Sequence, residues 1–140
     1  MSTPSDPRDD LAARIDAIES GYEYLLAYAA QGRTTHRGAG AAASRVGEHL
    51  EAMRAALEGL GQVVRVAAAT DEHDAAIVGA EFFDALDRDT AAARSAIGLV
   101  LSRPDISSQL VDNLNASIHL RATLTDIFVL DEVLKRRVPA

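Results

Sequence analysis

Residues 7–32 read PRDDLAARIDAIESGYEYLLAYAAQG, and this stretch decides the fold class. Its apolar residues recur at alternating intervals of four and three, which is the period of one face of an α-helix. That face consists of Leu11, Ile15, Ile18, Tyr22, Leu25 and Ala29. Pro7 suits a first helical turn, Ser5 or Asp6 is the expected N-cap, and Gly32 is the expected terminator. The spacing therefore predicts a helix over 7–31.

Three later stretches repeat this period and predict helices over 41–69, 72–102 and 106–137. In the second stretch Gly59 and Gly61 weaken the middle, yet the apolar phase continues through Val64, which favours one helix. Pro104 ends the third helix, and Asp105 is the expected cap of the fourth.

The chain is rich in the best helix former and poor in strand signals. Alanine accounts for 27 of the 140 residues, and no Asn-Gly or Asp-Gly hairpin turn occurs. Similar helix lengths and short connections make neighbouring helices antiparallel. We therefore expect an all-α, up-down-up-down four-helix bundle of long antiparallel helices, with residues 1–6 as a disordered N-terminal tail and 7–137 as a single domain.

Composition narrows the function classes. There is no cysteine, which excludes disulfides, thiolate metal ligands and cysteine nucleophiles. The net charge of −7 argues against nucleic acid or an anionic membrane as a partner, because phosphate binding depends on clustered Lys and Arg. No apolar run reaches the length of a membrane span, and the N-terminus has no signal-peptide core. We expect a cytoplasmic protein.

The segment Leu120–Leu134 departs from the simple pattern, because its apolar residues point almost all the way round a helix. A helix that is apolar on every side is buried on every side, so a second copy of the chain is the simplest cover. We expect a homodimer or a higher homo-oligomer, although a few scattered exposed leucines would need no explanation. Tyr24 and Tyr28 point away from the core face of their helix and suit an interface. The predicted interface residues are Tyr24, Tyr28, Leu120, Ile127, Leu130 and Leu134.

Charged residues also fall on predicted core faces. Projected at 100° per residue, Arg121 lies between Leu114 and Phe128, and Asp89 lies in the core face of 72–102. A buried charge needs a partner, which predicts a buried ion pair between Asp89 and Arg121; the alternative is that one of them binds an anion or a substrate.

A second polar set lies on the opposite side of the helix predicted over 106–137. It is either a solvated face or a strip that binds a ligand or partner. The strip comprises Asp112, Asn115, His119 and Asp126, with Thr123 between them.

Catalytic and metal motifs are lacking. No Glu has a His three residues later, so the ligand pattern of helical di-iron proteins is missing, and residues 71–74 suit an acidic helix start. Residues 119–125 resemble the phosphoacceptor box of sensor histidine kinases, but they lack its acidic residue after the histidine and its proline. We assign no catalytic, cofactor-binding or metal-binding residue and expect no cofactor.

The sequence favours a non-catalytic helical-bundle protein that acts as a homo-oligomeric adaptor, scaffold or regulatory interaction module for another protein. The alternative is a helical-bundle enzyme, either small-ligand-binding or metal-dependent, with an interior site around Asp89 and Arg121.

Overall fold

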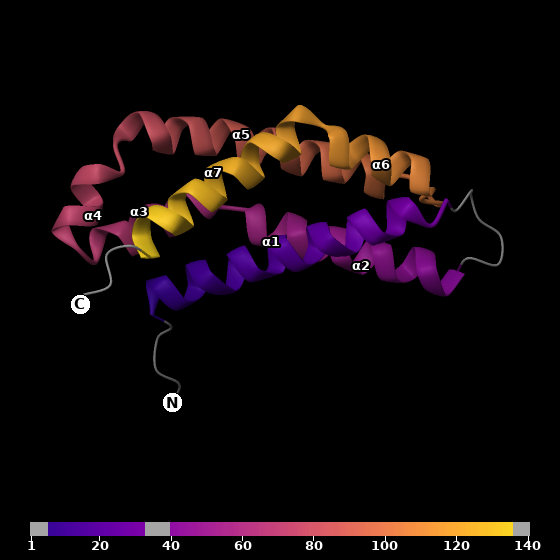
Figure 1. Ribbon diagram of the computed structural model, residues 1–140, viewed down its shortest axis with the longest axis horizontal. Helices are drawn as coiled ribbons and strands as arrows, with labels where there is room; N and C mark the ends of the chain where they lie inside the picture. Colours follow the sequence, from indigo (N-terminus) through magenta and orange to yellow (C-terminus); the bar gives the residue numbers. More distant parts are fainter. Residues whose placement is uncertain (1–5, 33–39, 136–140) are drawn as a thin grey trace.

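A computed structural model describes residues 6–32 and 40–135, and in these residues the chain is all α-helix with no strand. Seven helices follow one another along this part of the chain (Figure 1). They are α1 (Pro7–Ala30), α2 (Gly40–Leu57), α3 (Leu60–Ala69), α4 (Glu72–Ile77), α5 (Ala80–Leu101), α6 (Ser108–Ala116) and α7 (Ile118–Lys135). The all-α prediction is confirmed. Three predicted features lie outside the described residues. They are the tail predicted over 1–6, apart from Asp6, most of the connection before α2, and the helix end predicted at 137.

Only the first predicted helix is a single helix, and each of the other three is divided. The stretch 41–69 divides at Gly59, whose backbone has φ +68°, a left-handed conformation that glycine adopts without steric cost. Arg14 of α1 donates hydrogen bonds to the backbone carbonyls of Ala56 and Glu58 at 3.2 and 2.7 Å, and so satisfies the C-terminal end of α2. The predicted core face nevertheless runs through both helices, because Leu57, Leu60 and Val64 are all buried.

The stretch 72–102 divides between α4 and α5. Val78 is extended, Gly79 is the N-cap of α5, and the chain changes direction between the two helices (Figure 1). A glycine costs about 1 kcal/mol relative to alanine inside a helix, so a break here is inexpensive. It places Val78 in the core and leaves Ile77 exposed.

The stretch 106–137 begins later than predicted and divides at Ser117. Ser107 rather than Asp105 caps α6, and its hydroxyl accepts a hydrogen bond from the Leu110 amide at 3.1 Å. Ser117 then ends α6 with extended backbone, and its hydroxyl accepts from the His119 amide at 3.2 Å. Serine competes with the helix for backbone hydrogen bonds in this way, which is why it favours helix ends.

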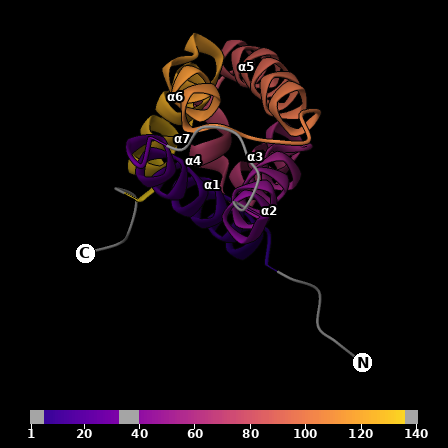
Figure 2. The same ribbon diagram turned by 90° about the vertical axis from the view of Figure 1, so that its right-hand side faces the viewer.

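The helices pack around one hydrophobic core. Viewed along the long axis, α1, α2, α5 and α6 are grouped around a common centre (Figure 2). Helix α1 packs against α2, α3 and α6, while α5 packs against α2, α3, α6 and α7. The largest fully buried side chains are Ile18, Leu25, Leu50, Met53, Leu57, Leu60, Leu86, Ile97, Leu120, Ile127, Val46 and Val64.

A partly buried ion pair joins the start of α1 to α4. Asp74 is only 1% exposed and pairs with the guanidinium of Arg8, which also donates from Nε to the Thr70 hydroxyl at 3.0 Å. Asp71 caps α4 by accepting from the amides of His73 and Asp74, as expected of an acidic helix start. The sequence indicated this start but not the partner of Asp74.

Candidate functional site

The residues predicted to form an interface lie mostly inside the single chain. Leu120, Ile127 and Leu130 are buried in its core, and Leu134 is half-buried. Leu120, Ile127 and Leu130 are therefore already covered within the chain, whereas the place of Leu134 in an interface stays a prediction. The cause is the break at Ser117, which changes the rotational phase of the helix that follows.

The phase change is visible in the burial pattern. In an unbroken helix, Ile118 would follow Leu114 by four residues and share its buried face. Instead Ile118 is 74% exposed and Leu120 is fully buried. The buried face of α7 therefore contains Leu120, Leu124, Ile127 and Leu130, together with Thr123, and other residues of α7 turn outward.

The two interface tyrosines of α1 are also less exposed than predicted. Tyr28 is buried, and its hydroxyl donates a hydrogen bond to the backbone carbonyl of Ile106 at 2.5 Å. Tyr24 is half-buried, with its ring stacked on His49 at a centroid distance of 3.9 Å. These rings join α1 to the chain before α6 and to α2.

The predicted ion pair between Asp89 and Arg121 does not form. Arg121 is exposed because of the phase change in α7, and Asp89 is half-buried. Asp89 instead faces Asp126 of α7, and the two carboxyl groups lie within hydrogen-bonding reach. Burial and the adjacent Asp89 carboxyl raise the pKa of Asp126 to about 7.

The predicted polar strip is likewise not one continuous face. Asp112 and His119 are exposed, but Asn115 is buried at the end of α6 and Asp126 is half-buried against α5. Thr123 is fully buried, and its hydroxyl donates to the His119 carbonyl at 3.0 Å. These residues were predicted to share a face because one continuous helix was assumed. The break at Ser117 rotates the later residues relative to the earlier ones, so the strip is not formed.

An apolar hollow lies where the α4–α5 junction meets the second half of α7. Its volume is about 180 Å³. It is lined by Ile77, Val78, Phe82, Val129, Leu130 and Val133. Val78 and Leu130 form its buried floor, because both belong to the core.

The apolar surface continues beyond this hollow along α7. A neighbouring depression is lined by Phe128, Val129, Glu132 and Val133. Ile77, Phe128, Val129 and Val133 are between 40 and 54% exposed. We call these four residues the α7 apolar surface. The sequence pointed to apolar excess in α7, but it did not indicate Ile77, which lies in a helix far from α7 in sequence.

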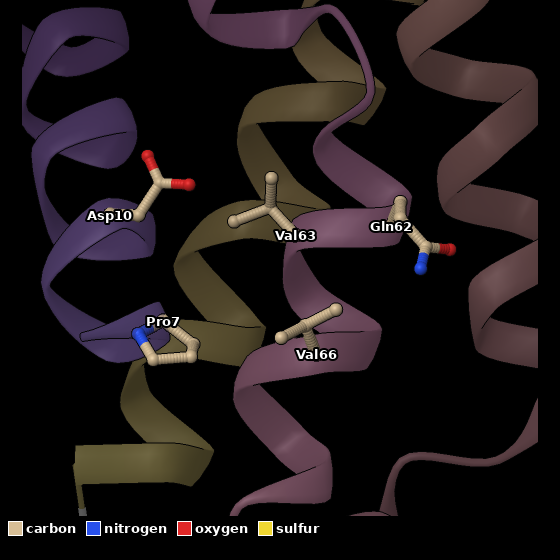
Figure 3. A pocket seen from close by; sticks show the side chains of 5 residues that line it. All are labelled: Pro7, Asp10, Gln62, Val63 and Val66. Atoms are coloured by element: carbon tan, nitrogen blue, oxygen red, sulfur yellow. The ribbon is translucent and has the colours of Figure 1, made fainter. Parts of the chain in front are cut away.

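A second hollow, of about 250 Å³, lies between the start of α1 and α3. Pro7 and Asp10 of α1 face Val63 and Val66 of α3 across it, with Gln62 at its margin (Figure 3). Asp10 is the only ionisable residue of the lining, and it accepts a hydrogen bond from Arg14 at 3.2 Å. A single carboxylate already held by an arginine does not form an acid–base pair.

Metal-ligating side chains are scattered through the described part of the chain. Within residues 6–32 and 40–135, no three His, Asp or Glu side chains gather as a potential metal site. In the same residues, no helix has the length and apolar character needed to cross a membrane.

Comparison with known proteins adds no assignment: no protein-family model matches the chain, and no curated protein or solved structure gives a significant match.

Proposed function

We propose that this protein is a non-catalytic, cytoplasmic helical protein that associates with itself and acts as an adaptor, scaffold or regulatory interaction module for another protein. The observation that carries the proposal is the α7 apolar surface. Three exposed apolar side chains, Ile77, Val129 and Val133, line an apolar hollow, and Phe128 extends this surface along α7. Contiguous apolar surface of this kind is typical of protein–protein contact sites.

The proposal includes a four-helix bundle in which consecutive short helices together form one long segment. The four segments are α1 alone, α2 followed by α3, α4 followed by α5, and α6 followed by α7. Packing between helices supports this arrangement, since α1 contacts α2 and α6, while α5 contacts α2 and α7. Each of these four segments would then pack against two neighbouring segments, as in an up-down-up-down bundle.

A second copy of the chain is the proposed cover of the α7 apolar surface. A two-fold dimer brings the same patch of both copies together, so an apolar patch meets an apolar patch without a new complementary surface. Three of the four residues that line the depression along α7 are apolar, and the fourth is Glu132. The desolvation of charge on association is therefore small.

The test is Val129→Glu, followed by sedimentation velocity across a range of protein concentrations. Val129 is 54% exposed, so covering the rest of its side chain contributes about 1 kcal/mol per copy, and a buried glutamate adds a desolvation cost. Because a symmetric dimer contains the substitution twice, we expect the dissociation constant to rise by at least about 100-fold.

The matched control is Leu99→Glu, which places the same charge on α5. Leu99 is 73% exposed and lies 17 residues after Phe82, about 25 Å away along the helix. We expect this variant to associate like the wild type. Equal association of both variants contradicts the proposal. A wild-type chain that is still monomeric at about 100 μM, which is about 100 times the dissociation constant of a weak micromolar dimer, also contradicts it.

A further inference from the structure

Two carboxyl groups face each other across the contact between α5 and α7. Asp89 comes from α5 and Asp126 from α7, two helices that pack directly against each other. The Oδ2 atom of Asp126 is sealed from solvent and has no hydrogen-bond donor among the described residues. Two ionised carboxylates in this position would repel each other, and water cannot reach the sealed Oδ2 atom.

Among the described side chains, neither Asp89 nor Asp126 forms an ion pair with a cation. On α5, Arg88 is exposed and Arg94 approaches Glu58 at 3.7 Å. On α7, Arg121 is exposed. Helix α6, which also packs on α7, carries Asp112 as its only charged residue, and that side chain is exposed. Burial and the Asp89 carboxyl are what raise the pKa of Asp126.

We propose that Asp89 and Asp126 share one proton and make the α5–α7 contact a pH-sensitive joint. With the proton present, one carboxyl donates a hydrogen bond to the other and the two helices are held together. When the proton leaves, both groups are ionised and the contact loosens.

The direction of the pH dependence follows from the protonation states. Burial and the neighbouring carboxyl raise the pKa of Asp126 to about 7 in the folded chain, whereas an unfolded aspartate titrates near 3.9. Between these values the folded state binds more protons than the unfolded state. Its stability is therefore greatest at low pH in this window, falls as pH rises toward 7, and levels off above it.

The joint lies next to the α7 apolar surface. Val129 and Leu130 follow Asp126 by three and four residues, so they occupy the next turn of α7 on the same side. Loosening the α5–α7 contact would therefore alter the hollow that these residues line, and with it the self-association of the chain. This effect on self-association rests on the proposed function, whereas the proton-sharing joint does not.

The test is urea unfolding from pH 5 to 8.5, at protein concentrations low enough that association contributes nothing, for wild type, Asp126→Asn and Asp112→Asn. Asparagine keeps the shape of Asp126 and donates to Asp89 at every pH. We expect the unfolding constant of wild type relative to Asp126→Asn to rise by up to about tenfold per pH unit below pH 7 and then to level off. Asp112→Asn removes an exposed charge, and its curve should run parallel to that of wild type.

If Asp126→Asn does not fold, the protonation of the carboxyl groups can be measured directly in the wild type. A ¹³C NMR titration of wild type should show one aspartate carboxyl with a midpoint near 7, and this resonance should shift in Asp89→Asn. Parallel stability curves for wild type and Asp126→Asn, or aspartate carboxyls that all titrate below pH 5, overturn the proposal. Sedimentation of Val129→Glu tests the interface separately, so failure of either idea is recognisable.

Discussion

Replacing Gly21 with alanine should destabilise the protein, although alanine is the better helix former. Gly21 lies in the middle of α1 and is buried against α2. A Cβ atom at this position would lie 2.3 Å from Cγ and 2.6 Å from Sδ of Met53. Met53 is itself fully buried, so it has no open space into which it can move.

The expected magnitude is the difference between two opposing effects. Overpacking a dense core costs about 1–3 kcal/mol, while the change from glycine to alanine inside a helix contributes up to about 1 kcal/mol of stability. The net loss for Gly21→Ala is therefore about 1 kcal/mol. Gly47→Ala is the matched control, because Gly47 lies inside α2 with no atom within 4 Å of the added Cβ. It should stabilise the chain by up to about 1 kcal/mol.

The assay is urea unfolding followed by circular dichroism at 222 nm, with thermal unfolding as a second measurement. The two alanine variants should differ by about 2 kcal/mol, which corresponds to about 6 °C in Tm for a chain of this length. In a Met53→Ala background, the cost of Gly21→Ala should disappear, because the clashing side chain is gone. If Gly21→Ala is at least as stable as Gly47→Ala, the close approach of α1 and α2 at Met53 is refuted.

Two further substitutions test the ends of helices. Arg8→Met should lower the free energy of unfolding by about 2 kcal/mol, which is less than for a fully buried pair because Arg8 is 38% exposed. Urea unfolding at pH 7 measures this loss. The control is Arg54→Met, which breaks an exposed pair with Glu51 and should change the free energy of unfolding by less than about 1 kcal/mol. Ser117→Ala should cost about 1 kcal/mol through the lost cap on the His119 amide, whereas unchanged stability and unchanged hydrogen exchange at that amide would show that the cap contributes nothing.

Much of the fold could be predicted because helical periodicity is a local property of the sequence. The faces predicted for α1 and for the stretch 41–69 are mostly buried in the structure, as at Ile18 and Val64, although Tyr22 is only half-buried. Periodicity did not indicate where helices end. The breaks at Gly59, Gly79 and Ser117 depend on one or two residues whose helix propensity is only about 1 kcal/mol below that of alanine, and tertiary packing decides such small differences.

The candidate site could be predicted only in part because one break changes the phase of everything after it. The excess of apolar residues in 120–134 correctly indicated that α7 has more apolar surface than one core covers, since Phe128, Val129 and Val133 remain exposed. Which residues they are depends on the rotation introduced at Ser117. The same rotation removes Arg121 from the core and places Asp126 opposite Asp89.

The α7 apolar surface is thus a product of two breaks that are far apart in the sequence. The break between α4 and α5 leaves Ile77 exposed beside the buried Val78, and the break at Ser117 turns Val129 and Val133 toward the same hollow. Removing either break by itself would shift one side of the hollow and leave the other in place.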